Sequence, residues 1–135
     1  LVRSRGLGDV YKRQIVFTGK LNSSKGYDLF GKAIIKILDK YDDWSAIVAG
    51  NEPREKYDFN HKRLKIFPWL PHKKILKIYQ NSSISVVPSR WEEPFGRTAM
   101  ESSAHGCATI TSNRGGLTET FNNELKDIFM IINGR

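Results

Sequence analysis

The sequence lacks several features that would assign it to a specialised class of protein. Cys107 is its only cysteine, so a disulfide within the chain is impossible, which fits a reducing compartment. No run of about 18 or more apolar residues is present, so the sequence predicts no transmembrane helix. The three histidines and Cys107 show no metal-ligand spacing, and we therefore expect no metal site.

The length and charge of the chain indicate one domain with a basic leader. The 135 residues, 39% of them hydrophobic, suffice for a single core. Residues 1–14 carry +3 of the net charge of +8, and they have neither an apolar segment nor a cleavage site typical of a signal peptide. They resemble translated sequencing-adapter read-through, with a natural basic arm as the alternative. We expect a non-native or disordered leader over 1–14 and a domain over 15–135.

The apolar pattern alternates between strands and helices. Six short apolar segments are typical of buried strands, at residues 15–19, 45–50, 64–67, 83–89, 107–111 and 128–132. Between the first two, apolar side chains recur three or four apart, which predicts an amphipathic helix with the buried stripe Tyr27, Phe30, Ala33, Ile34, Ile37, Leu38 and Tyr41. Pro71 suits the start of a second helix, and Gly106 suits the end of a third over 97–105.

This alternation predicts an α/β fold, a Rossmann-like doubly wound parallel sheet whose strands are buried on both faces. In such sheets ligands bind beyond the carboxyl ends of the strands. The loops that follow strands are therefore the candidate site, and they span residues 19–26, 88–96 and 113–119.

Two lysines flank the first of these loops. The ammonium groups of Lys20 and Lys25 can hold a diphosphate there. The alternative is that both are simply solvated, as surface lysines usually are.

The segment "RWEEPFGRTAME", residues 90–101, is more informative. Gly96 lets the backbone approach a ligand, and the N–H groups that follow it at a helix start favour an anion. Glu93 precedes the turn and Glu101 lies inside the helix, so carboxylates can accept hydrogen bonds from sugar hydroxyls on both sides. This arrangement suits a nucleotide-sugar. The alternative, acidic residues placed for the helix dipole, explains Glu93 but not the spacing or the glycine.

The neighbouring residues Arg90, Trp91 and Arg97 have two interpretations. An arginine can contact a phosphate and Trp91 can pack on a ring, or all three can serve packing and solvation. The loop at 113–119 has the same ambiguity, because Gly115 and Gly116 allow either a ligand contact or a simple turn.

The loop "GKLNSSKG" and the segment "VVPSRWEEPFGRTAMESSAHGCATITSNRGGLTE" resemble the C-terminal lobe of GT-B glycosyltransferases, in the retaining family four or group 1. The resemblance covers about residues 15–132. It implies that Glu93 faces the donor sugar, that Phe95 and Gly96 offer backbone N–H groups, and that Glu101 binds the ribose. Arg97 and Thr98 follow at the helix start and belong to the same implied donor site.

The resemblance also assigns residues to the diphosphate and the base, with departures. Lys25 matches a lysine on the diphosphate, whereas Lys20 stands where the family usually has arginine. The loop with Pro68 and Trp69 would lie by the base, but "FPWLP" lacks a glycine often found there. The implied catalytic residues are Lys20, Lys25 and Glu93.

The implied reaction is transfer of a hexose from a nucleoside-diphosphate sugar to an acceptor hydroxyl, with retention, in cell-surface glycan or lipopolysaccharide synthesis. No cofactor or metal is expected, because lysines and a helix N-terminus can stabilise the departing diphosphate. A front-face route fits better than a covalent intermediate. The family has two lobes, so we expect a fragment without its N-terminal lobe that is inactive alone, and an acceptor that is a glycan or lipid-linked.

Three other functions stay open at this point. A glycosidase also uses two carboxylates but does not need the lysines. The runs "NHKRLK" and "PHKK" can bind nucleic acid, yet they lack stacking aromatics, so we expect no nucleic-acid partner. Basic surface also suits anionic lipid, which places the protein in the cytoplasm or peripherally on the inner face of the cell membrane.

Overall fold

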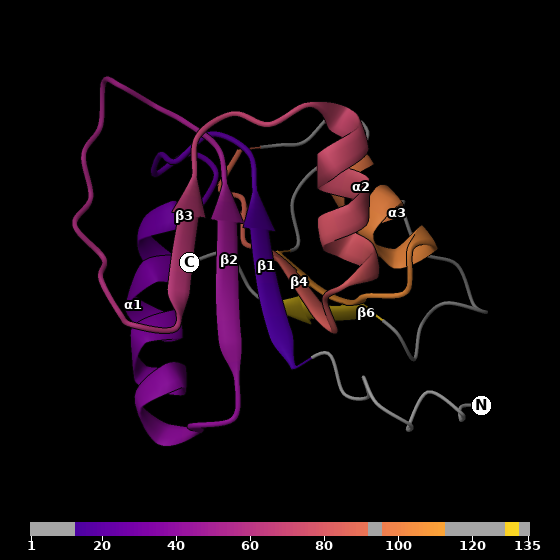
Figure 1. The fold of residues 1–135 in the computed structure, drawn as a ribbon. Coiled ribbons are helices and arrows are strands. Elements are labelled where there is room, and N and C mark those ends of the chain that lie inside the picture. Colours follow the sequence, from indigo (N-terminus) through magenta and orange to yellow (C-terminus); the bar gives the residue numbers. More distant parts are fainter. Residues whose placement is uncertain (1–12, 92–95, 113–128, 133–135) are drawn as a thin grey trace.

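The computed structural model describes residues 13–91, 96–112 and 129–132. Strands and helices alternate over most of the described chain, as Figure 1 shows, but residues 50–63 join two consecutive strands without a helix. Their order is β1 (Gln14–Thr18), α1 (Tyr27–Lys40), β2 (Ser45–Ala49), β3 (Leu64–Phe67), α2 (His72–Gln80), β4 (Ile84–Val87), α3 (Arg97–Ala104), β5 (Ala108–Ser112) and β6 (Phe129–Ile132).

The strands form one sheet in the order β3-β2-β1-β4-β5-β6, and every neighbouring pair is parallel. The order reverses at β1, because the chain first builds outward to β3 and then crosses back to β4. Helix α1 covers one face, whereas α2 and α3 lie on the other (Figure 1). This is the Rossmann-like doubly wound arrangement predicted from the apolar pattern.

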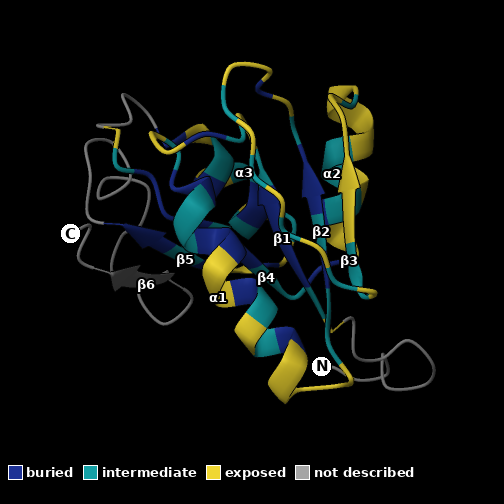
Figure 2. Ribbon diagram, turned by 90° about the vertical axis from the view of Figure 1, so that its left-hand side faces the viewer, coloured by how far each residue is buried: buried dark blue, intermediate teal, exposed yellow. Residues whose placement is uncertain are grey.

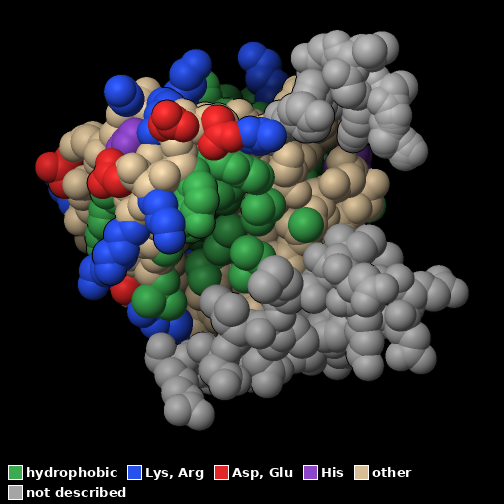
Figure 3. Space-filling model, turned by 90° about the horizontal axis from the view of Figure 1, so that it is seen from below, with side chains coloured by type: hydrophobic (Ala, Val, Ile, Leu, Met, Phe, Trp, Pro, Cys, Tyr) green, Lys and Arg blue, Asp and Glu red, His purple; other side chains and the backbone are tan. Residues whose placement is uncertain are grey.

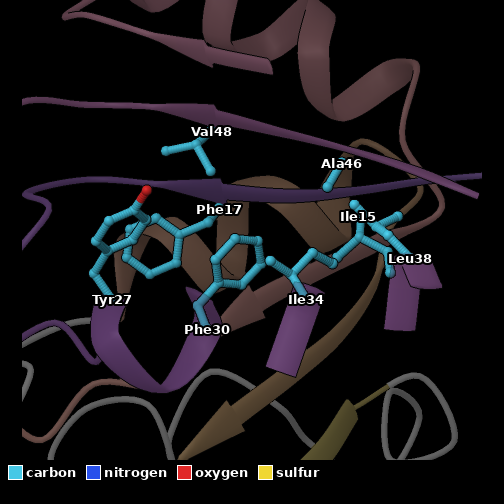
Figure 4. Close-up of a cluster of buried hydrophobic side chains, with 8 residues drawn as sticks. All are labelled: Ile15, Phe17, Tyr27, Phe30, Ile34, Leu38, Ala46 and Val48. Atoms are coloured by element: carbon cyan, nitrogen blue, oxygen red, sulfur yellow. The ribbon is translucent and has the colours of Figure 1, made fainter. Parts of the chain in front are cut away.

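The main core lies between α1 and strands β1 and β2. Figure 4 shows its eight side chains, and the apolar spacing of α1 places four of them, Tyr27, Phe30, Ile34 and Leu38, on the sheet. Phe17 of β1 packs at 5.2 and 5.1 Å, between ring centroids, from the first two. Full burial of one such side chain contributes roughly 1.5–3 kcal/mol, so this stripe holds the helix to the sheet.

Two members of the predicted stripe are exposed. Ala33 stands about 100° around the helix from Ile34, at the margin of the buried face. Tyr41 is extended, with φ of −119°, so it has already left the helix and is 47% exposed.

The other face has a smaller core beneath α2. Val16 of β1 packs there against Tyr79 of α2 and against Cys107, which precedes β5, and all three are almost completely buried. Pro71 is the residue before α2, and Gly106 adopts a positive φ of 99° just beyond α3, so both predicted helix signals are confirmed.

Two details differ from the apolar pattern. Strand β1 begins at Gln14, one residue before the strand predicted at 15–19, and Arg13 forms an ion pair with Asp43. Strand β3 is not buried on both faces, since Lys65, Ile66 and Phe67 are all exposed. It pairs only with β2 at the edge of the sheet, and Figure 2 shows its exposure.

The described residues of the predicted donor site and the surface in Figure 3 lie at opposite ends of the sheet. Figure 3 shows the end where β1, β2 and β3 begin, with a patch of hydrophobic side chains beside charged side chains of both signs. The described parts of the loops that carry predicted donor-binding residues lie at the opposite end, where these strands finish.

Candidate functional site

A pocket of about 430 Å³ opens at the carboxyl ends of β1 and β2, between the first turns of α2 and α3. Four of the predicted donor-binding residues line it: Lys20, Trp69, Thr98 and Glu101. They come from three separate segments of the chain, because Thr98 and Glu101 both lie in α3. The pocket lies at the edge of the sheet where ligands bind in parallel α/β folds, beyond the carboxyl ends of the strands.

A smaller cavity of about 30 Å³ adjoins the pocket, and Lys25 lines it. Thr18, Gly19 and Thr98 line both cavities, so the two lysines of the first loop border one continuous region. Two ammonium groups beside a helix start create a positive field suited to a diphosphate.

Helix α3 presents its N-terminus to this region. Gly96 precedes the helix with φ of 64°, a left-handed conformation that glycine adopts without strain, and as a glycine it has no side chain to cap the helix. The first N–H groups of a helix have no acceptor within it. The amides at the start of α3 can therefore donate to an anion beside Thr98.

Glu101 lies one turn further into α3 and pairs with His72. The Nε2 atom of His72 is 3.3 Å from Oε2 of Glu101, and both residues line the pocket. His72 was not predicted as a site residue, because the sequence marks it only as the residue after a helix-starting proline. The contact aims the Glu101 carboxylate from α3 toward the beginning of α2.

Tyr79 is a second residue that the sequence did not indicate. Its ring is buried in the core under α2, and its hydroxyl lies 2.7 Å from Oγ1 of Thr18 in the floor of the pocket. Burial raises the pKa of Tyr79 to about 12, so the hydroxyl stays protonated. It therefore acts as a neutral hydrogen-bonding group.

Glycines let the loops at this end of the sheet approach one another. A Cβ atom on Gly50 would lie 1.7 Å from the carbonyl oxygen of Gly19, and one on Gly26 would lie 2.0 Å from that of Pro88. These close approaches bring the loops after β1, β2 and β4 together at the rim of the site.

The remaining predicted residues have different positions. Trp69 is 73% exposed, so its ring stands open to solvent at the edge of the pocket. Pro68 and Arg97 are exposed and line neither cavity. Glu93, Phe95 and the loop at 113–119 lie outside the described residues, so their roles stay predictions.

The described residues contain neither a metal-binding cluster nor a membrane-spanning helix. Within 13–91, 96–112 and 129–132, no group of three or more His, Cys, Asp or Glu residues is placed to hold a metal ion. No helix in these same ranges is sufficiently long and apolar to cross a membrane.

Comparison with known proteins places the chain in a family. The profile described as "Glycosyl transferases group 1" matches residues 6–131. An uncharacterised glycosyltransferase of Methanocaldococcus jannaschii, MJ1607, is 30% identical over 134 residues, which are 95% of this chain and 34% of that protein. The lipopolysaccharide core biosynthesis mannosyltransferase LpcC of Rhizobium leguminosarum is 31% identical, over 75% of this chain and 31% of its own length. The chain thus spans about a third of these relatives.

Solved structures show the same fold. The C-terminal domain of the group 1 glycosyl transferase LpcC from Francisella tularensis superposes with a TM-score of 0.76 and 26% identity, over 90% of this chain and 68% of that one. Anabaena Alr3699/HepE, solved in complex with UDP-glucose, gives a TM-score of 0.74 at 17% identity, over 96% of this chain and 37% of that one.

Proposed function

The chain belongs to the group 1 glycosyl transferases and has the fold of one Rossmann-like lobe of a GT-B enzyme, and we propose that this lobe binds a nucleoside-diphosphate sugar. In the full-length enzyme the hexose is then transferred to an acceptor hydroxyl with retention. The observation that carries the proposal is the convergence of Lys20, Lys25, the start of α3 and Glu101 on one region at the carboxyl ends of the strands. Positive charge there suits a diphosphate, and a carboxylate beside it suits ribose hydroxyls.

The comparisons support the donor class and the type of sugar. A structural neighbour was solved with UDP-glucose, and a relative is a mannosyltransferase of lipopolysaccharide core synthesis. We therefore assign a hexose donor and an acceptor that is a glycan or lipid-linked. A lipid-linked acceptor would place the reaction in the cytoplasm, at the inner face of the cell membrane.

The difficult step of this reaction is the departure of the diphosphate. Its negative charge grows as the glycosidic bond breaks, so Lys20, Lys25 and the amides of α3 stabilise the transition state more than the ground state. Such contacts make a metal unnecessary in this proposal. In this scheme the leaving phosphate accepts the acceptor's proton on the front face, and Glu93 holds the hydroxyls of the transferred sugar.

The test separates the two glutamates of the motif. Loss of a charged hydrogen bond costs roughly 1.5–3 kcal/mol, so Glu101→Ala should weaken free nucleoside diphosphate by about 10- to 100-fold. Glu93→Ala should barely change that affinity and yet reduce transfer strongly. Calorimetric titration of UDP, GDP and ADP, with transfer rates from the full-length enzyme, measures both effects.

This experiment, together with assays of glycoside hydrolysis and DNA binding, discriminates among the other functions. Equal loss of nucleotide affinity in both variants would show that the two carboxylates only shape the helix start. Nucleotide binding without transfer in the full-length protein would leave a binding lobe with no activity of its own. Hydrolysis of a glycoside that nucleoside diphosphate does not inhibit would indicate a glycosidase, and salt-dependent DNA binding would indicate a nucleic-acid module.

A further inference from the structure

The loop that carries both lysines is organised by a buried asparagine. Asn22 is only 9% exposed, and its backbone N–H donates to the carbonyl oxygen of Lys20 at 2.9 Å. Its side-chain Oδ1 accepts the backbone N–H of Lys25 at 2.9 Å. Its carbonyl oxygen accepts the N–H of Tyr27, the first residue of α1, at 3.0 Å. One residue therefore links the two lysines and the start of the helix.

A buried carboxylate holds this asparagine from the neighbouring loop. Asn22 Nδ2 donates to Oε2 of Glu52 at 3.3 Å, and the Glu52 side chain is only 3% exposed. Arg54 donates to the same carboxylate from its backbone N–H, Nε and Nη2, at 3.1, 2.9 and 2.9 Å. These contacts, chiefly those of the Arg54 side chain, lower the pKa of Glu52 to about 2, so the group is ionised at neutral pH.

The ionised carboxylate fixes which way the Asn22 amide points. A carboxylate can only accept hydrogen bonds, so the NH₂ group of Asn22 must face Glu52. That orientation leaves Oδ1 as the acceptor for the N–H of Lys25. A reversed amide would set two oxygen atoms against each other at Glu52 and two donors against each other at Lys25.

We propose that Asn22 and Glu52 are positioning residues that hold Lys25 and Lys20 against the diphosphate of the donor. Neither touches the nucleotide; they act through the shape of the loop at 20–26. This inference rests on the proposed function, because it presumes a diphosphate beside the lysines. It predicts that these two residues govern recognition of the distal phosphate, not of the nucleoside.

The experiment compares nucleoside diphosphates with the matching monophosphates. UDP, GDP and ADP are each titrated beside UMP, GMP and AMP, and the pair that the full-length wild type binds most tightly is used. Loss of one charge-assisted contact lowers binding affinity about tenfold. Asn22→Ala and Glu52→Gln should therefore each lower the affinity for the diphosphate by about 10-fold. The monophosphate affinity should change by less than about 2-fold.

Exchanging the amide of Asn22 and the carboxylate of Glu52 should restore the affinity for the diphosphate. In the double variant Asn22→Asp/Glu52→Gln, the Gln amide can donate to the new carboxylate, whose second oxygen still accepts from Lys25. We expect it to recover most of the diphosphate affinity that Glu52→Gln loses. Asp39→Asn is the matched control, because this carboxylate contacts His61 on the exposed side of α1 and lines neither cavity.

The outcomes separate the two proposals. Parallel loss of mono- and diphosphate affinity, or a double variant no better than Glu52→Gln, would overturn the positioning role and leave donor binding intact. A wild-type protein that binds no nucleoside diphosphate would overturn the proposed function and the positioning role with it. Thermal unfolding of each variant identifies any loss that comes from a destabilised fold.

Discussion

Arg90 donates two hydrogen bonds to Asp28, of 2.7 and 3.0 Å, and so joins the loop after β4 to the first turn of α1. The same guanidinium donates to the carbonyl oxygen of Ser23 at 2.7 Å. Its bidentate bond lowers the pKa of Asp28 and raises its own pKa. Of the two interpretations of Arg90, the described contacts favour the structural one over contact with a phosphate.

Arg90→Ala should destabilise the protein by about 1–2 kcal/mol at neutral pH, because it removes a partly exposed bidentate pair. The pKa of Asp28 is depressed in the folded protein, so the pair contributes fully above the ordinary value of 3.8 and is lost as the pH falls through the folded value. Urea unfolding at neutral pH and below pH 3.8 measures the difference. A deficit that is equally large in acid would contradict the role of the ion pair.

Gly26→Ala should destabilise far more than Gly106→Ala. Both glycines have positive φ, of 75° and 99°, so an alanine is strained at either position. Only at Gly26 would the new Cβ meet backbone, 2.0 Å from the carbonyl oxygen of Pro88, whereas nothing lies within 4 Å at Gly106. We expect about 1–2 kcal/mol for Gly106→Ala and about 3 kcal/mol or more for Gly26→Ala, measured by thermal unfolding. Equal losses would show that backbone strain alone decides both.

Lys25→Ala in the full-length enzyme should lower the turnover number more than it raises the Michaelis constant. The charge on the diphosphate grows as the bond breaks, so this contact tightens in the transition state, and we expect a decrease of about 100-fold in kcat. Lys32→Ala is the control, since Lys32 is exposed on α1 and lines neither cavity. An unchanged kcat with only a raised Michaelis constant would count against the role of Lys25.

Cys107 should react slowly with thiol reagents in the folded protein. It is 1% exposed, and burial raises its pKa to about 11 from the ordinary 9.0. Two pKa units leave about 100-fold less thiolate near neutral pH, so maleimide labelling should be at least about 100-fold slower than in denaturant. Mass spectrometry of timed samples measures both rates. Rapid labelling without denaturant would mean that the core beneath α2 opens readily.

The predicted helices and strands follow from local pattern, and so does the location of the site. The buried stripe of α1, which begins at Tyr27, could be predicted because apolar residues three or four apart share one helix face. The first loop, with Lys20 and Lys25, is far in sequence from α3, with Glu101, yet the sequence predicts that the two segments meet. All parallel strands finish at the same edge of a sheet, so loops after strands must gather there.

Side-chain partners at the site were decided only by the tertiary structure. The pairs Asn22–Glu52, His72–Glu101 and Asp28–Arg90 each join residues about 30 or 60 positions apart. No periodicity encodes such a pair, because it depends on where two loops or helix ends come to lie after the strands have paired. The sequence by itself determined the parallel sheet and the edge that carries the lysines, since both follow from short-range apolar order. Which carboxylate orients which donor was decided by packing between loops, where a shift of one ångström makes or breaks a hydrogen bond.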